Sequence, residues 1–408
     1  MGKCHPFSGR YRTLAAVTVM IIAVISGLAL TRGPRLKRAM LPPKAGKTSL
    51  FLGSQAALAV GDSPRGGDLS SVVCNKEGDF WVLLSYSGGE RKGIVWAKRT
   101  RGIWTSPATL AAWKFIFGLK VIQDSLGNPC AIWYGFDEAT GQAIAVSMWM
   151  DNGWSTPIIL DRLPAGQSIN SIDAIRDAEG ALHVVYDRPL APAEEYSRGL
   201  VIASGAFADK AFHAYFDGKQ WSKPSPTTGR GRYSVNGLRL SNAPDGQVCL
   251  SAEYAPFGRV SLKNHYIGYQ TWARNKWSSV GKILPPDEGR DGRNLLPALF
   301  LIDSWGLGHA WYYRTDVHQS EYYQVHGATA SKAAFPGAAL RPFVISNPKG
   351  GLASSCSGSV CLWDGNEWCE PLPVGENDGL TVSPSGRIFV WRWRERQVVI
   401  QEVIVKEE

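Results

Sequence analysis

The sequence predicts an all-β fold, a β-propeller of seven four-stranded blades, with six blades as the alternative count. Two recurring hairpin patterns and their spacing lead to this prediction. In the first pattern an apolar run enters a tight turn that ends in glycine, and a run rich in Val, Ile, Trp and Tyr follows. Such turns need a positive φ angle, which glycine adopts without strain, and the flanking residues are typical of strands. The turn glycines are Gly78, Gly127, Gly180, Gly246, Gly306, Gly350 and Gly386.

The second pattern lies between successive glycine turns and predicts an outer hairpin for each blade. An apolar strand is followed by a short polar turn, then by Trp and in most cases by Pro. Proline suits an outermost strand, which needs no second ladder of hydrogen bonds, and we expect the Trp to pack between blades. The turn glycines are 36 to 66 residues apart, which leaves room for two hairpins, the size of a propeller blade. A pair of β-sandwiches is the alternative fold, but it would not explain such regular alternation.

The two ends of the repeat region predict how the ring closes. Residues 49–60 have the composition of a lone strand before the first glycine turn, and residues 398–405 have that of a last strand. We expect residues 49–60 to pair with the C-terminal strand and to complete the last blade. Residues 48–408 would then form one propeller.

The first 47 residues differ from the rest of the chain. Residues 1–12 form a short tail, and residues 13–30 carry no charge over about 18 positions, which suits either a membrane-spanning helix or a signal peptide. Residues 31–47 have the composition of a basic tether. The first 47 residues hold nine Lys and Arg and no acidic residue, which leaves 35 basic and 35 acidic residues in the remainder. Because the folded part has no basic excess, we predict that it binds no nucleic acid.

The D-x-x-G inner turns and the Asp–Gly–Trp outer turns resemble those of the sialidase-like, or BNR/Asp-box, propeller superfamily over residues 48–408. Asp151, Asp217 and Asp364 lack the Ser that stands two residues before the Asp in a full Asp-box, and the Phe-Arg-Ile-Pro tetrapeptide of true sialidases is absent. Propellers of this superfamily are mostly exported or on the cell surface. The flanking charges alone would keep the body in the cytoplasm, but the resemblance implies a secreted or single-pass membrane protein with its propeller outside.

The resemblance also implies a ligand site at one end of the channel, where the loops that follow the second strand and precede the first strand of each blade meet. Similar sialidases use an arginine cluster for the substrate carboxylate and a Tyr activated by Glu. The predicted ligand-binding residues are Arg188, Arg232, Arg293, Arg314 and Tyr254. The predicted catalytic residues are Tyr313 as nucleophile, Glu253 as its activator and Asp187 as acid/base. Because arginine forks bind carboxylates and sulfates, an acidic glycan is the expected ligand, with a cell-surface protein as the alternative partner.

Equal distances from the turn glycines support this set of residues. Arg188 and Arg314 both follow their glycine by eight residues, and Glu253 and Tyr313 follow theirs by seven. Equal offsets place residues at equal depth around the ring, and adjacent offsets alternate between the two faces of a strand. We therefore expect the arginines to converge at one end of the channel, and only one of the two sets to point inward.

The histidines and cysteines divide into buried and reactive candidates. Propeller-type polysaccharide lyases, in which His or Tyr takes a proton, make His318 a candidate base, whereas His183 and His309 lie in apolar runs and are expected to be packed. Cys74, Cys130 and Cys249 are expected to be small buried hydrophobes in the core. A disulfide between Cys356 and Cys361, across a short hairpin, is left open.

The sequence therefore predicts a membrane-tethered or exported propeller that acts as a glycan-binding, protein-binding or scaffold module. The alternative is a glycoside hydrolase or polysaccharide lyase that acts on acidic glycans. The binding role is favoured because no complete catalytic signature is present. No H-E-x-x-H, G-x-S-x-G, C-x-x-C or phosphate-loop motif occurs, so no metal and no cofactor are predicted.

A phosphatase fused after residue 408 tests the predicted location. The exported form of such an enzyme is active only outside the cytoplasm, so we expect activity there. A cytoplasmic reporter that is active at the same position would contradict the prediction and would support the charge count instead.

Overall fold

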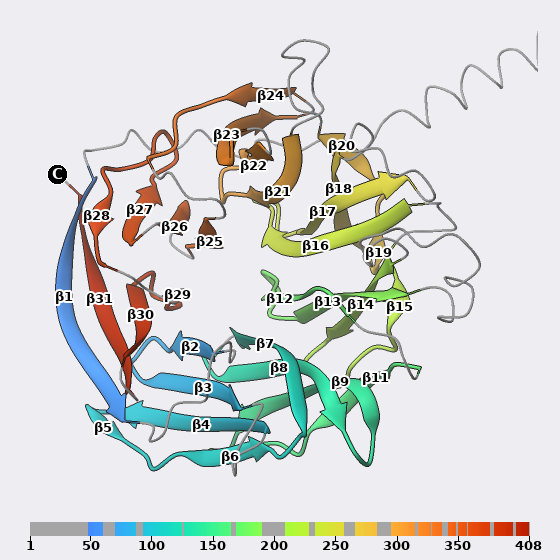
Figure 1. Ribbon diagram of the computed structural model, residues 1–408, viewed down its shortest axis with the longest axis vertical. Coiled ribbons are helices and arrows are strands. Elements are labelled where there is room, and N and C mark those ends of the chain that lie inside the picture. Colours follow the sequence, from blue (N-terminus) through green and yellow to red (C-terminus); the bar gives the residue numbers. More distant parts are fainter. Residues whose placement is uncertain are drawn as a thin grey trace, which may run out of the picture.

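The structure, a computed structural model, contains seven antiparallel β-sheets arranged around a central axis (Figure 1). The seven-bladed propeller is therefore confirmed, and the alternative of six blades is wrong. The expected N-terminal helix over residues 13–30 lies outside the described residues, and within those residues no helix could span a membrane. The described residues are 48–59, 70–86, 93–124, 126–164, 169–189, 209–227, 233–256, 266–283, 295–314, 317–327, 329–336, 342–347, 350–356, 358–375, 379–394 and 397–407.

Blades 1 to 6 take their strands in chain order from the channel outward, and in three of them the outermost strand is broken in two. Blade 1 consists of β2 (Ser70–Cys74), β3 (Phe80–Tyr86), β4 (Gly93–Thr100), β5 (Ile103–Trp104) and β6 (Ala108–Ala111). Blade 2 consists of β7 (Phe115–Gln123), β8 (Pro129–Asp137), β9 (Gly141–Met150), β10 (Gly153–Trp154) and β11 (Ile158–Arg162). Blade 3 consists of β12 (Ile172–Arg176), β13 (Leu182–Pro189), β14 (Asp209–Phe216) and β15 (Ser225–Pro226). Blade 4 consists of β16 (Tyr233–Asn242), β17 (Val248–Pro256), β18 (Tyr266–Ala273), β19 (Lys276–Trp277) and β20 (Gly281–Ile283). Blade 5 consists of β21 (Leu295–Ile302), β22 (Gly308–Arg314), β23 (Gln319–His326) and β24 (Thr329–Lys332). Blade 6 consists of β25 (Phe343–Ser346), β26 (Leu352–Cys356), β27 (Ser359–Trp363) and β28 (Leu372–Pro373).

Blade 7 joins the two ends of the propeller. Its order is β29 (Gly379–Val382), β30 (Ile388–Arg394), β31 (Gln397–Glu407) and β1 (Thr48–Ala59). β1 runs antiparallel to β31, from Thr48 opposite Glu407 to Ala59 opposite Gln397. The N-terminal strand thus occupies the fourth place of the last blade, where residues 49–60 were expected. β30 pairs with β31 only as far as Val403, so the first residues of β1 and the last of β31 form a two-stranded ribbon beyond it.

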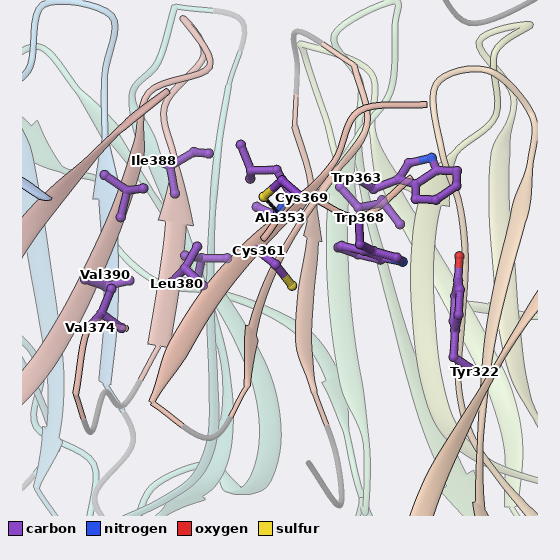
Figure 2. Packing of buried hydrophobic residues seen from close by; sticks show 14 of the residues in the cluster. Tyr322, Ala353, Cys361, Trp363, Trp368, Cys369, Val374, Leu380, Ile388 and Val390 are labelled. Atoms are coloured by element: carbon purple, nitrogen blue, oxygen red, sulfur yellow. Dashed lines mark hydrogen bonds between the residues drawn. The ribbon is translucent and has the colours of Figure 1, made fainter. Parts of the chain in front are cut away.

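The core lies between the blades, because the faces of adjacent sheets pack against each other. Figure 2 shows one such cluster around blade 6. Trp363 and Trp368 lie on the side of Tyr322, which comes from blade 5, and Leu380 and Ile388 of blade 7 lie on the other side. The Trp of the outer hairpin packs against the preceding blade, as predicted. Trp154 contacts Trp96 of blade 1, and Trp277 lies 5.0 Å from the ring of His213 in blade 3.

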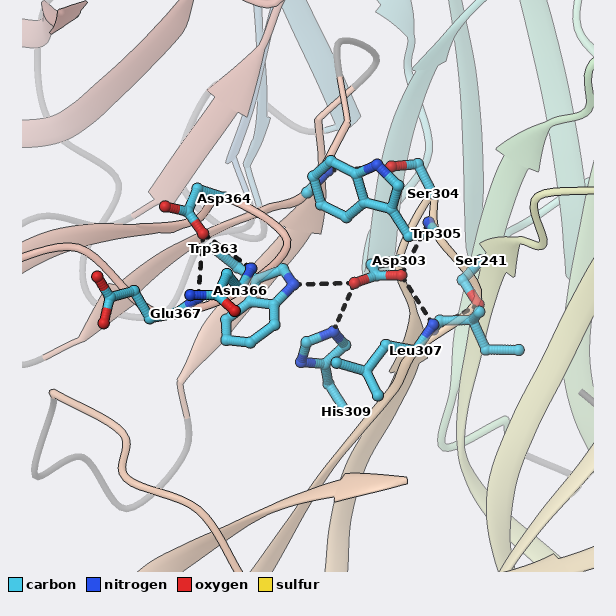
Figure 3. A network of polar contacts seen from close by, with 12 residues as sticks. Ser241, Asp303, Ser304, Trp305, Leu307, His309, Trp363, Asp364, Asn366 and Glu367 are labelled. Atoms are coloured by element: carbon cyan, nitrogen blue, oxygen red, sulfur yellow. Dashed lines mark hydrogen bonds and ion pairs between the residues drawn. The ribbon is translucent and has the colours of Figure 1, made fainter. Parts of the chain in front are cut away.

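The carboxylate of the inner turn connects the turn to the next blade. Oδ1 of Asp303 accepts hydrogen bonds from the backbone N–H groups of Trp305 and Leu307, which closes the turn. Oδ2 accepts from the ring of His309 at 3.1 Å and from the indole N–H of Trp363 in blade 6 at 2.9 Å (Figure 3). A buried polar group costs free energy unless it is hydrogen-bonded, and here each oxygen has two partners.

His183 of blade 3 and His309 of blade 5 are buried, as predicted. Because a carboxylate only accepts, Nε2–H of His309 donates to Asp303 and its Nδ1 accepts from the hydroxyl of Tyr322 at 2.7 Å. The ring of His183 donates to Asp177 in the same way and accepts from His213 at 2.9 Å. These bonds suit neutral imidazoles.

The cysteines of the described residues are buried, and none of them forms a disulfide. Burial of Cys74, Cys130 and Cys249 confirms that they are part of the core. Cys356 and Cys361, whose pairing was left open, form no disulfide.

The buried histidines predict a fold that loses stability in acid. Burial lowers the pKa of His183 and His309, although Asp177 and Asp303 oppose the shift, and burial together with His183 lowers the pKa of His213 to about 3. A histidine in the unfolded chain has a pKa of about 6.5. The unfolded chain therefore binds protons first, so the stabilisation is complete above about pH 6.5 and declines as the pH falls below it.

Thermal unfolding at a series of pH values measures this effect. The melting temperature should fall on acidification below about pH 6.5. His213→Leu should flatten the dependence. His326→Ala, which replaces an exposed histidine whose charge is the smallest of the causes acting on the pKa of His309, should change it far less. A melting temperature that rises over this range would contradict the prediction.

Candidate functional site at the mouth of the channel

The mouth is the end of the ring where each second strand ends and each innermost strand begins. Three innermost strands carry a β-bulge close to this end. The bulges lie between Ile116 and Gly118 in β7, between Asn236 and Arg239 in β16, and between Pro297 and Leu299 in β21. A bulge bends its strand and redirects a side chain, and bulges are frequent beside active sites.

The bulge of β7 presents two phenylalanines to solvent. Phe115 is 38% exposed and Phe117 is 47% exposed, and their rings are stacked with centroids 6.1 Å apart. The ring of Phe117 also lies 5.3 Å from that of Tyr134 in β8. Phe115, Phe117 and Tyr134 are called the aromatic platform below. Exposed apolar patches of this kind mark binding sites more often than they serve stability.

Two charged groups flank the platform. The ammonium of Lys114 lies 6.0 Å from the ring centroid of Phe115 and 3.1 Å from Glu138. On the other side, burial and then the charge of Asp187 raise the pKa of Tyr134. The phenol of the platform is therefore held in its neutral form.

Asp187, the predicted acid/base, is fully buried. Its Oδ1 accepts hydrogen bonds from the backbone N–H groups of Asn170 at 2.8 Å and Ser171 at 2.9 Å. These bonds hold the chain where it enters β12, next to the platform. The structure thus gives Asp187 a role in fixing the backbone, and its catalytic role stays a prediction.

The two described arginines of the predicted cluster lie on different blades. Arg188 of blade 3 pairs with Asp161 at 3.1 Å, and Arg314 of blade 5 pairs with Glu321 at 3.3 Å. Blade 4 lies between them, and each arginine already forms an ion pair with its own carboxylate. Arg232 and Arg293 lie outside the described residues, so the convergence of all four arginines stays a prediction.

The faces of the second strands explain this arrangement. Tyr254, eight residues after its glycine, is buried and donates to Gln270, whose amide reaches the carbonyl of Thr227 in blade 3. Ser251, on the opposite face, donates to the carbonyl of Phe300 in blade 5. Alternate residues thus face the two neighbouring blades, whereas the channel is lined by the edges of the innermost strands. Tyr254 therefore lies in the packed layer between blades 3 and 4, and not at the channel.

Glu253 and Tyr313 follow the same alternation. Glu253 shares its face with Ser251, toward blade 5. Tyr313 shares its face with Trp311, which packs in the cluster of blades 5 to 7. The side chain of Tyr313 therefore points away from blade 4, which carries Glu253.

Tyr313 instead meets the candidate base His318. Its hydroxyl lies 2.8 Å from Nδ1 of His318, within hydrogen-bonding distance. His318 is exposed, and its backbone has a φ of 53° in the loop that follows β22. The structure thus brings together two residues that the sequence analysis had chosen for different mechanisms.

A cationic stretch lines the channel next to the platform. Lys120 of β7 pairs with Asp173 of β12 at 2.7 Å, and Oδ2 of Asp173 accepts from the backbone N–H of Leu240 in β16. Burial acts to raise the pKa of Asp173, but Lys120 and Arg239 outweigh it and hold this pKa below its usual range. The innermost strands of blades 2, 3 and 4 thus share two cations and one carboxylate.

Sequence reasoning missed the platform and these cations. The signal for the platform was the Phe-x-Phe before Gly118 at the start of a predicted strand, which also fits a buried strand. Lys120 and Arg239 lie in innermost strands, from which no candidate was chosen. Within the described residues no group of three or more His, Cys, Asp or Glu side chains could hold a metal ion.

No family model and no curated protein matches the sequence. Solved structures share its fold. An ulvan lyase of polysaccharide lyase family PL25, bound to -[GlcA(1-4)Rha3S]-, is 12% identical over 85% of this chain and 94% of its own, with a TM-score of 0.50. A puromycin hydrolase is 14% identical over 80% of this chain and 50% of its own, with a TM-score of 0.53. A Hadza microbial sialidase is 11% identical over 79% of this chain and 76% of its own, with a TM-score of 0.48. These likenesses show the fold alone, a β-propeller.

Proposed function

We propose that the mouth of this propeller binds a glycan. The exposed, stacked pair Phe115 and Phe117 is the observation that carries the proposal. Aromatic faces that stand open to solvent at a bulged strand offer an apolar surface of the size of a sugar ring. The buried ring of Tyr134 packs against Phe117 and supports the exposed pair, and an apolar surface with polar groups nearby is typical of ligand binding.

Acidic glycans are the class of ligand that the charges favour. Lys120 and Arg239 lie on innermost strands beside the platform, and together they exceed the single charge of Asp173. A uronate or a sulfate ester would be attracted to this stretch. The ulvan lyase with the same fold is bound to a saccharide that carries both glucuronate and a sulfate group, which supports this choice of class.

A binding module fits these residues better than a hydrolase does. Arg188 and Arg314 are already paired with carboxylates, and Asp187 holds the backbone of the loop before β12. We further propose that the propeller lies outside the cytoplasm, tethered through residues 13–30 or released by cleavage after them. The apolar character of these residues supports that location.

A polysaccharide lyase is the second candidate, and the Tyr313–His318 pair favours it. In β-elimination one group removes the proton next to the uronate carboxylate, and another donates a proton to the leaving oxygen. A phenol and an imidazole 2.8 Å apart, in an exposed loop, can serve as such a pair.

Replacing one platform residue tests the binding role. Phe117→Ala should weaken the retention of uronate- or sulfate-bearing polysaccharides by about three- to tenfold, since an aromatic contact contributes about 0.5–1.5 kcal/mol. Affinity electrophoresis and calorimetry measure the change. The melting temperature should remain the same because Phe117 is exposed.

Ile158→Ala is the matched control for this test. Ile158 lies on the outer strand β11 of the same blade and is as exposed as Phe117, so its loss should leave retention unchanged. Equal retention by Phe117→Ala and the parent chain would refute the platform as a glycan site. Release of unsaturated uronate that disappears in both Tyr313→Phe and His318→Ala would establish the lyase in place of the binding module.

A further inference from the structure

Large exposed apolar side chains gather at both ends of the ring. Near the mouth they are mostly aromatic. At the opposite end, where the innermost hairpin turns and the outer hairpin turns lie, they belong to blades 7, 1 and 2, which follow one another around the ring (Figure 1). The mouth set is Phe115, Phe117, Val317 and Phe343. The opposite set, called the apolar sector below, is Phe51, Leu52, Ile103, Leu126, Met150, Ile404 and Val405.

The most exposed members of the apolar sector are the tips of turns. Ile103 is 76% exposed as the first residue of β5, directly after the turn from β4, and Leu126 is 70% exposed in the turn between β7 and β8. Met150 is the last residue of β9, beside the next outer turn. Side chains at such tips make few contacts within the fold, so their apolar character does not serve the core.

The ribbon of β1 and β31 completes the apolar sector. Phe51 lies directly opposite Ile404, and Leu50 lies opposite Val405. Because β30 pairs with β31 only as far as Val403, this part of the ribbon extends past its neighbour. Phe51, Ile404 and Val405 therefore stay open to solvent.

Equivalent turns on other blades are polar. The outer turn of blade 3 exposes residues 217–220, Asp-Gly-Lys-Gln, and that of blade 4 exposes residues 274–276, Arg-Asn-Lys. Asn366 and Glu367 are exposed in the outer turn of blade 6. Among the described residues, the large exposed apolar side chains of this end are therefore confined to blades 7, 1 and 2. They are not a general feature of these turns.

Cations accompany the apolar tips. Arg101 lies in the turn directly before β5, two residues before Ile103, with a φ of 50°, and the ammonium of Lys406 lies 4.7 Å from the ring centroid of Phe51. Lys76 is exposed in the inner turn of blade 1, next to Glu77. Among the described residues of the turns that blades 1 and 2 have at this end, Asp151 is the other exposed carboxylate. Apolar side chains next to Lys and Arg are the composition of surfaces that lie in a bilayer interface.

The course of the chain places this sector beside the N-terminal segment. β1 begins at Thr48 at this end of the ring, three residues before Phe51. The sequence before it consists of the apolar residues 13–30 and the basic residues 31–47, which hold six Lys and Arg. A segment that enters a bilayer would therefore deliver the chain to the propeller at the apolar sector.

We propose that the apolar sector rests on the surface of a bilayer with anionic lipids, in which residues 13–30 are embedded, and that the mouth faces away from the membrane. Ile103, Leu126 and Met150 enter the interface from the turn tips, and Arg101 and Lys406 meet the anionic headgroups. Each contact is small, but the tether holds the sector near the lipid, so weak contacts suffice to orient the ring. The proposal rests on the tethered form of the proposed location and does not depend on glycan binding at the mouth.

Fluorescent labels at the two ends of the ring test this orientation in the full chain. Cys4→Ser removes the thiol that lies outside the described residues, and the others are buried. Burial raises the pKa of Cys74 and of Cys249 to about 12, which leaves little reactive thiolate. Single cysteines are then introduced as Ile103→Cys, Met150→Cys and Val317→Cys, and each carries an environment-sensitive dye.

The labelled chains are reconstituted in vesicles of phosphatidylcholine and phosphatidylglycerol with doxyl groups on the acyl chains. The dyes at 103 and 150 should shift to shorter wavelength and lose most of their emission. The dye at 317, an apolar position at the mouth that is about as exposed as Met150, should do neither. Vesicles of phosphatidylcholine alone should quench the first two dyes less, because the cations lose their partners.

Three results would overturn the proposal. The first is a dye at 103 that is no more quenched than the dye at 317. The second is quenching at 317, which would place the mouth on the membrane. The third is a dye at 103 that is shielded already in detergent, together with self-association in light scattering, which would assign the apolar sector to a contact between two copies. None of these readouts involves a glycan, so failure here leaves the proposed function untouched.

Discussion

The pairing of β1 with β31 is the constraint on which the ring depends. Without it, β31 would be a bare outer edge with unpaired backbone groups, and blade 7 would be held to its neighbours by side-chain packing alone. The same pairing fixes the direction in which the N-terminal strand runs. Because β1 runs antiparallel to β31, Thr48 must lie at the end opposite the mouth, so one strand pair decides both how the ring closes and from which side the N-terminal segment arrives.

Once the ring is closed, both faces of every blade are covered by neighbours. Polar groups on these faces must be neutral or satisfied, which is why Asp303 accepts four hydrogen bonds and why His309 donates to it as a neutral ring. The chemistry available to a ligand is therefore limited to strand ends, loops and the innermost edges. The bulged start of β7 is such a place, and it is there that Phe115 and Phe117 stand exposed.

The sequence predicted the parts of the fold that local chemistry determines. Turn glycines and the Trp of the outer hairpin, such as Gly306 and Trp277, have local causes, so their spacing indicated both the strand number of a blade and the count of blades. The site was harder to predict. The argument from the distances to the turn glycines assumed that alternate residues of a strand point into the channel or away from it. In a propeller, alternation instead selects one of two neighbouring blades, which is why Tyr254 is buried and Arg188 faces Asp161 of blade 2. Phe117 was missed because a bulge cannot be recognised in an apolar strand.

Exposed apolar residues have different meanings at the two ends of this ring, and their chemistry separates the two. At the mouth three of the four are phenylalanine, and two of these are stacked beside a tyrosine. Flat, rigid rings in fixed positions suit a ligand with a defined face. In the apolar sector six of the seven are aliphatic, at turn tips and on a protruding ribbon. Flexible aliphatic groups spread over three blades cannot define the shape of a ligand, but they suit a fluid hydrocarbon surface, which has no shape to match.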